Sequence, residues 1–273
     1  MSKILAAIVT GIVIALAAAN VWPVLVRAIG MPMAAAAEAL FLSAYVIWAR
    51  GGGPPRSWHA ARAERFRARS LSRLEWAFGL VAALAFAATV HAAMVVLFRL
   101  VPYPAEAFHR GYDFSFIPGR QMQLLACVVS ALSAGVCEET GFRGYMQAPI
   151  EQRHGAAGAI VVSSLFFTLI HLTKGWALLG MVPIVFGAGV LLGVLASASR
   201  SLVFCMIGHT IMDVGLFAYW WTQVLGTFPQ TPGFDLSFVV ECGVLAAALF
   251  VTLAATRAVR RARPAVTPRG VTA

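Results

Sequence analysis

Ionisable residues recur inside the apolar part of this sequence, and their spacing determines which of them can meet. Two adjacent acids, Glu138 and Glu139, are followed by Arg143 in the stretch CEETGFRGY. Residues four apart on a helix share a face, so Glu139 and Arg143 can form an ion pair. Glu138 points about 100° away from Glu139, where one arginine cannot satisfy both acids equally. Glu138 is therefore the acid left available for chemistry.

Two later apolar runs carry histidines at helical spacing. His171 comes four residues after Phe167, and His209 comes four residues before Asp213. The midpoint between positions 138 and 171 falls in a polar break of the sequence. With a rise of about 1.5 Å per residue, two antiparallel helices joined at that break place Glu138 and His171 at the same depth. The sequence therefore predicts a buried polar cluster built from three helices.

A cluster of this composition suits amide hydrolysis. A carboxylate can serve as the base that activates water, and a hydrogen-bonding group can stabilise the oxyanion that forms. Two histidines and a carboxylate would also suit a catalytic zinc ion with one open position. No HExxH motif places two histidines one helical turn apart, which slightly favours a metal-free mechanism. If a divalent metal is present, the candidate ligands are Glu138, His171, His209 and Asp213.

Other polar residues in the apolar runs have structural interpretations. Ionisable groups in a membrane are costly unless they are paired, so each is a candidate for function. We interpret His91 as a hydrogen-bond partner between helices, and Glu38 and Glu241 as packing or interfacial acids. Gly189 and Gly193 form a small-xxx-small pattern, which is typical of close helix packing.

The elements that must position these residues are membrane helices. The mean hydropathy is +0.81, with 60% hydrophobic and only 12% charged residues, whereas soluble domains have about 25% charged residues. Runs of about 20 apolar residues can cross the hydrocarbon core. We therefore predict an all-α, polytopic transmembrane bundle of about eight spans. The predicted spans are 4–26, 31–49, 76–100, 121–146, 157–172, 177–197, 201–224 and 236–256.

Basic residues gather beside apolar segments, mainly in 50–73 and 257–269, and give a net charge of +10. The segment 225–235 contains no lysine or arginine. The positive-inside rule then predicts that both termini are cytoplasmic. This distribution indicates contact with anionic lipid headgroups and not with nucleic acid.

Two segments on the cytoplasmic side need separate interpretation. The remainder of the 50–75 loop, after its Gly and Pro residues, is either an interfacial helix or a solvated basic loop. The segment 3–21 resembles a signal peptide, but its apolar run continues, so we expect a retained first helix. The four cysteines share no CxxC spacing and are expected to be reduced fillers of the core.

Three polar motifs occur in a fixed order on successive predicted spans: EExxxR at Glu138, FxxxH at Phe167 and HxxxD at His209. This pattern resembles the CPBP family, the CAAX-protease and bacteriocin-processing membrane endopeptidases, also called the Abi family. The resemblance covers about 121–225, which would be the catalytic core. The segments 1–120, with three spans, and 226–273, with the last span and a basic tail, lie outside it.

The resemblance implies an intramembrane endopeptidase, similar to CAAX prenyl protease 2 and either glutamic or metal-dependent. Glu138 would activate water with the help of His171. His209 and Asp213 would stabilise the oxyanion or complete a metal site. The supporting residues would be Glu139, Arg143 and Phe167. Eukaryotic CAAX endopeptidases typically carry asparagine at the position of Asp213, whereas acidic versions are familiar among bacterial members.

Two other functions fit the same residues. A non-catalytic binding or bacteriocin-immunity protein of this fold would use the cluster to hold a ligand. A proton-coupled transporter would use it as a relay, but the sequence lacks repeated halves. The composition, rich in arginine and alanine, indicates a bacterial inner membrane, where a peptide or membrane protein is a better substrate than a prenylated chain. The basic inner loops favour access to the site from the cytoplasm.

Overall fold

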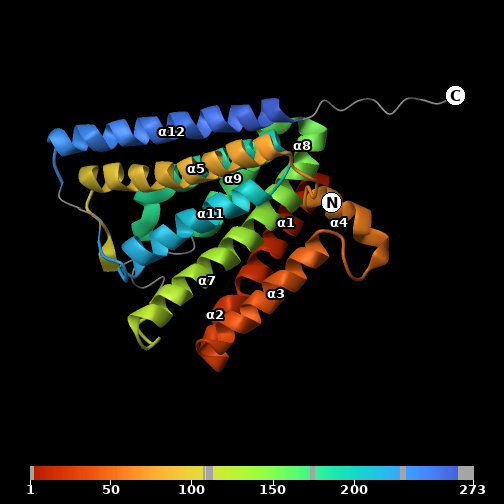
Figure 1. Ribbon diagram of the computed structural model, residues 1–273, viewed down its shortest axis with the longest axis horizontal. Helices are drawn as coiled ribbons and strands as arrows, with labels where there is room; N and C mark the ends of the chain where they lie inside the picture. Colours follow the sequence, from red (N-terminus) through yellow and green to blue (C-terminus); the bar gives the residue numbers. More distant parts are fainter. Residues whose placement is uncertain (1–2, 107, 109–112, 173–175, 228–231, 264–273) are drawn as a thin grey trace.

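The structure is a computed structural model that describes residues 3–106, 108, 113–172, 176–227 and 232–263 (Figure 1). The described residues form helices and no strand. The helices of the first part are α1 (Lys3–Ala19), α2 (Val21–Ile29), α3 (Met33–Ala49), η1 (Arg56–Trp58), α4 (His59–Arg65) and α5 (Arg73–Leu100). The helices of the second part are α7 (Arg120–Glu139), η2 (Thr140–Gln147), α8 (Ala148–His154), α9 (Ala156–Leu172), η3 (Trp176–Met181), α10 (Val182–Ser199), α11 (Val203–Gly215), η4 (Leu216–Trp221) and α12 (Leu236–Ala262).

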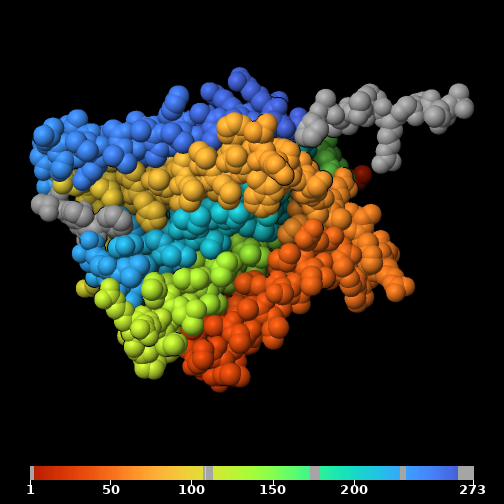
Figure 2. Space-filling model, viewed as in Figure 1, coloured from red at the N-terminus to blue at the C-terminus, as the bar shows by residue number. Residues whose placement is uncertain are grey.

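The predicted membrane bundle is confirmed. Six stretches in the described part of the chain are long and apolar enough to cross a membrane, and α3 and α9 are shorter apolar helices. These eight stretches correspond in order to the eight predicted spans. α12 packs along α5 at one edge of the molecule (Figure 2). Its outer face exposes large apolar side chains such as Val239, Val244 and Phe250, as a lipid-facing helix would.

The two ends of the bundle differ in charge. Figure 1 shows α4, α8, the start of α1 and the end of α12 together at one end. We call it the arginine end, because it carries the basic segments 50–73 and 257–263. The loops after α5 and after η4 lie at the opposite end. Residues 264–273 of the predicted basic tail lie outside the described residues. The arrangement places both predicted cytoplasmic segments on one side, while the orientation in a membrane stays a prediction.

The arginine-rich loop is folded and not simply solvated. It contains the short helix α4, and Arg62 is only 2% exposed. The Arg62 guanidinium donates hydrogen bonds of 2.8 Å to the carbonyls of Gly52 and Gly53, and it lies over the ring of Trp48. The solvated interpretation is therefore wrong for Arg62. The same is true of Arg67, which is buried and paired below.

The predicted spans 121–146 and 157–172 leave residues 147–156 between them, yet most of this stretch is helical in the structure. The helix continues through His154 and ends at Gly155, whose φ of 81° favours glycine. Gln147 and Glu151 had the polar character of a loop, yet both are buried inside the helical stretch. Gln147 Nε2 and the Glu151 carboxylate have hydrogen-bond partners on α10, which reduces the cost of burying them.

Two helices continue into a π-helical segment near an acidic residue of the site. η2 begins directly after Glu139, and η4 begins at Leu216, three residues after Asp213 and directly after the end of α11. η2 packs against α1, where a Cβ on Gly141 would lie 2.5 Å from the carbonyl oxygen of Gly11. Only glycine allows this approach of the two backbones. π-Helical turns are rare and often occur at functional sites.

An aromatic cluster closes the opposite end. The ring centroids of Phe98 and Tyr103 are 4.9 Å apart, and those of Tyr103 and Phe108 are 5.0 Å apart. The Tyr103 hydroxyl donates a hydrogen bond to the carbonyl of Trp220 in η4. This contact ties the loop after α5 to the helix that carries His209.

Candidate active site

Glu139 joins two helices through one oxygen. Arg143 donates a hydrogen bond from Nη1 to Glu139 Oε1 at 2.9 Å, as the four-residue spacing predicted. His209 Nδ1 on α11 lies 2.7 Å from the same oxygen. All three side chains are almost completely buried. The ion pair therefore positions His209 as well as its own helix, a contact that the sequence pattern did not reveal.

His209 has an acid at each ring nitrogen. Its Nε2 lies 3.5 Å from Asp213 Oδ2, one turn further along α11. Carboxylate oxygens accept hydrogen bonds, so both ring nitrogens face acceptors. The ring cannot turn without losing one of these contacts, and its orientation is fixed from both sides.

Phe167 is the apolar support of the cluster. Its ring packs edge-on against His209, with centroids 5.9 Å apart, and lies next to His171. The guanidinium of Arg143 lies 4.5 Å above the same ring. A cation over an aromatic face is stabilised most where water is excluded, which suits this buried position.

His171 has a defined tautomer when neutral. Its Nδ1 lies 2.7 Å from the carbonyl oxygen of Phe167. A carbonyl only accepts hydrogen bonds, so Nδ1 carries the proton and Nε2 is an acceptor. An imidazole acceptor is the form that can orient a water molecule or take a proton from it.

The four predicted catalytic side chains line one cavity of about 80 Å³. They are Glu138 on α7, His171 on α9, and His209 and Asp213 on α11. Most of the remaining wall is apolar and comes from α10, η4 and the end of η3. We call this hollow the lateral cavity. The equal depth that the sequence predicted for Glu138 and His171 agrees with their common place on its wall.

A second cavity of about 450 Å³ meets the first. The two share four wall residues, and these are Ala134, Glu138, His171 and Phe217. The larger hollow also has polar walls, which include Asn20, Ser130 and Ser133. We call it the α2-side cavity, because α1 and α2 form one of its walls. Glu138 and His171 therefore lie where an apolar and a more polar cavity join.

The residues do not form a metal site as they are arranged. In the part of the chain that the structure describes, no group of three or more His, Cys, Asp or Glu side chains is arranged to hold a metal ion. Nδ1 of His209 contacts Glu139, and Nδ1 of His171 contacts the Phe167 carbonyl; metal-binding histidines commonly make such contacts and bind the metal through the other ring nitrogen. The ligand set considered from the sequence stays a prediction.

The other ionisable candidates lie outside the cluster. His91 Nε2 is 3.1 Å from the carbonyl of Met212, so it bridges α5 and α11 as interpreted from the sequence. Glu241 on α12 lies 3.8 Å from Arg99. Glu38 is fully buried on α3, which packs against α7. None of the three lines the lateral cavity.

The sequence analysis did not predict a series of polar contacts between the site and the arginine end, which we call the polar ladder. Three contacts join η2 and α8 to α10 at a constant offset: Arg143 to the Gly189 carbonyl (3.2 Å), Gln147 to the Gly193 carbonyl (2.9 Å) and Glu151 to Ser197 (2.7 Å). The four-residue spacing of positions 139, 143, 147 and 151 was a visible signal of a polar helix face. Gly189 and Gly193 confirm the predicted close packing, and their carbonyls accept hydrogen bonds from Arg143 and Gln147.

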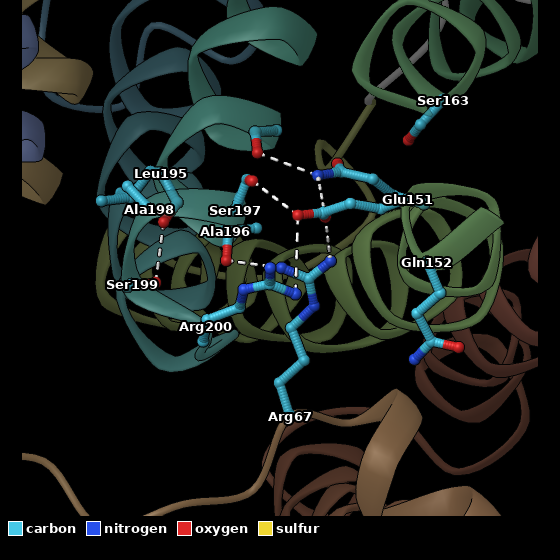
Figure 3. A network of polar contacts seen from close by, with 12 residues as sticks. Arg67, Glu151, Gln152, Ser163, Leu195, Ala196, Ser197, Ala198, Ser199 and Arg200 are labelled. Atoms are coloured by element: carbon cyan, nitrogen blue, oxygen red, sulfur yellow. Dashed lines mark hydrogen bonds and ion pairs between the residues drawn. The ribbon is translucent and has the colours of Figure 1, made fainter. Parts of the chain in front are cut away.

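Glu151 ends the ladder in a network at the arginine end (Figure 3). Its carboxylate accepts from Arg67 at 2.6 Å and from Ser197 at 2.7 Å, and Arg200 lies 3.6 Å away. Arg67 also donates to the carbonyl of Ala196 near the end of α10. The network therefore joins the loop before α5 to α8 and α10.

Comparison with known families agrees with this geometry. Residues 120–215 match the family model described as Rce1-like, type II CAAX prenyl endopeptidase. This stretch contains all the residues assigned to the cluster, from Glu138 to Asp213. No curated protein and no solved structure matches the chain.

Proposed function

We propose that this chain, whose residues 120–215 form a domain of the CPBP family of CAAX-type membrane proteases, is an intramembrane endopeptidase that cleaves a peptide or membrane protein. One observation carries the proposal. Glu138, His171 and His209 come from three helices and line a single cavity. A base, an acceptor nitrogen and a donor group around one small hollow are the requirements of amide hydrolysis.

The roles follow from the contacts. Glu138 takes a proton from water, and the acceptor Nε2 of His171 orients that water for attack on the peptide carbonyl. His209 is held through Nδ1 by Glu139, and its Nε2–H, whose contact with Asp213 is long at 3.5 Å, donates to the oxygen that becomes negative. Arg143 and Phe167 are positioning residues: Arg143 holds Glu139, and Phe167, on the wall of the lateral cavity, packs against His171 and His209.

The proposed mechanism contains no metal step, because no group of three or more His, Cys, Asp or Glu side chains among the described residues is arranged to hold a metal ion. We place the protein in a bacterial inner membrane with both termini cytoplasmic. The substrate class is an unprenylated peptide segment. The matching family model is described as a CAAX prenyl endopeptidase, and this description says what the characterised members of the family cleave.

The experiment compares membranes from cells that carry wild-type protein, Glu138→Gln or Glu241→Gln. The second variant is the matched control, because it makes the same change in another membrane helix, away from both cavities. We expect at least one membrane peptide to lose a defined cleavage only in Glu138→Gln. Retention of every cleavage, or of the full biological effect, would favour the non-catalytic immunity protein instead.

Metal dependence is measured in the same assay. Purified protein treated with a strong chelator and then freed of it should cleave the identified peptide as before. Loss of cleavage that zinc restores would replace the glutamic mechanism with a metal-dependent one.

A further inference from the structure

The two cavities that meet at Glu138 lie in different directions within the bundle. The lateral cavity lies among α9, α10 and α11 and is mostly apolar. The α2-side cavity is larger and has walls from α1, α2, α7 and the loop before α7. Water and a polar chain are stabilised by the second environment, while apolar side chains are stabilised by the first.

The direction of the α2-side cavity follows from the course of its walls. α1 starts at the arginine end, so Asn20 and Arg27, near its continuation into α2, lie toward the opposite end. α7 starts at the opposite end, so Ser130 lies between that end and Glu138. Asp113 belongs to the loop at the opposite end itself. The α2-side cavity therefore extends from Glu138 toward the end of the bundle opposite the arginine end.

The path toward the arginine end is filled instead. Below Glu139 the space between η2, α8 and α10 is occupied by the polar ladder, whose residues Arg143 and Gln147 are completely buried. Arg67 and Glu151 complete the packing at the interface. Neither cavity is lined by these four residues.

We propose that water and the polar part of the substrate reach Glu138 through the α2-side cavity from the non-cytoplasmic face. The proposal rests on the proposed peptidase function and on the positive-inside orientation. It reverses the expectation of cytoplasmic access from the basic loops, because Arg62 and Arg67 of the 50–73 segment are buried in the fold. The substrate is then a membrane-embedded segment with an apolar residue for the lateral cavity and polar residues on its non-cytoplasmic side.

The test introduces one cysteine at the junction and measures which face supplies a charged, membrane-impermeant methanethiosulfonate. Ala134→Cys places a thiol on the wall shared by both cavities. Ser57→Cys reports the arginine end, and Leu165→Cys is an exposed apolar position on α9. The unchanged chain, with its own four cysteines, gives the background.

A second pair of variants identifies the route. Ala19→Trp fills the α2-side cavity from its α1 wall, whereas Ala17→Trp adds the same ring at an exposed position of the same helix. Each is combined with Ala134→Cys. Labelling by a small permeant maleimide after denaturation shows that every variant is present in the membrane.

We expect Ala134→Cys to react in intact spheroplasts, where the reagent meets only the non-cytoplasmic face. Ser57→Cys should react only in inside-out vesicles, and Leu165→Cys in neither. Adding Ala19→Trp should abolish the reaction of Ala134→Cys, and adding Ala17→Trp should leave it unchanged. The pattern should persist with Glu138→Gln, so it is independent of catalysis.

Three results would overturn the route. These are reaction of Ala134→Cys only in inside-out vesicles, no reaction from either face, or reaction that Ala19→Trp leaves unchanged. Reaction of Ser57→Cys in intact spheroplasts would overturn the assigned side. A failure of the peptidase itself would appear elsewhere, as unchanged cleavage in the Glu138→Gln comparison.

Discussion

Glu138 and Glu151 lie on one continuous helical stretch, and the fold surrounds them differently. Glu151 is enclosed by Arg67, Ser197 and Arg200, which come from three separate positions at the arginine end. Glu138 lies on the walls of two cavities. In the sequence, Glu138 lies within a predicted span and Glu151 lies in the polar break that follows it. This difference supports the proposal that Glu151 holds helices together, whereas Glu138, at the junction of the two cavities, contacts the substrate.

The largest expected effect separates the two acids directly. Glu138→Gln should lower cleavage by about 10²–10⁴-fold, the usual loss when a general base is removed, with little change in thermal unfolding. Cleavage of the identified peptide and unfolding in detergent are measured on the same preparations. Glu151→Gln is the comparison variant, and it should change unfolding far more than the intrinsic rate of the folded enzyme. A rate loss in Glu151→Gln equal to that in Glu138→Gln would remove the distinction.

Next in size is the loss of the ion pair at the arginine end. Arg67→Met removes the charge and leaves Glu151 buried beside weaker partners, so the free energy of unfolding should fall by about 3 kcal/mol. Chemical denaturation in detergent gives this value.

Arg56→Met is the matched control, since Arg56 is exposed and should change stability by less than about 0.5 kcal/mol. In the double variant with Glu151→Gln, the destabilisation should be smaller than the sum of the two single changes. Strict additivity would mean that the pair is not coupled.

A smaller effect is expected in the ladder that connects the two regions. A Cβ at Gly193 would lie 3.0 Å from Gln147 Oε1 and 3.0 Å from Ile160. Gly193→Ala should therefore destabilise the protein by about 1–3 kcal/mol through overpacking. Gly187→Ala lies on the same helix with nothing within 4 Å of the added carbon. It should be neutral or stabilising by up to about 1 kcal/mol, and equal effects of both variants would contradict the close approach.

The smallest effect concerns an exposed acid that belongs to neither region. Hydrogen bonds from Ser237 and from the backbone N–H of Phe238, together with Arg99, lower the pKa of Asp235 from 3.8 to about 2. A depressed folded-state pKa gives stability that is complete above pH 3.8 and is lost as the pH falls through 2.

Asp235→Asn should remove this part of the acid dependence, since an asparagine does not titrate and still caps α12. Unfolding is followed at several pH values from about 5 to about 2. An unchanged pH profile in Asp235→Asn would assign the acid sensitivity to other carboxyls.

The sequence predicted the bundle and the residues that cluster, for physical reasons that are easy to name. Apolar runs of membrane length specify spans, and the spacing of Glu139 and Arg143 specifies a pair on one helix. The depth of Glu138 and His171 follows from the position of the break between their helices. These features depend on distances along the chain, which a sequence contains.

Features that depend on how helices rotate against each other were missed. The contact of His209 with Glu139 requires α11 to present that face to α7. Gln147 and Glu151 fall between two predicted spans because their polarity is typical of loops, although α10 supplies their partners in the structure. The walls of the α2-side cavity come from α1 and α2, which lie outside the family motifs.

The π-helical segment after Glu139 has a consequence for changes in chain length. A π turn accommodates an extra residue relative to an α-helix. Adding a further residue to Thr140–Gln147 would exceed what the wide turn absorbs and would rotate α8 by about 100° relative to α7. Gln147 and Glu151 would then face away from Gly193 and Ser197. Removing one residue would return the segment to an α-helix with α7 and α8 still in phase, so this stretch should tolerate the loss of a residue better than the gain of one.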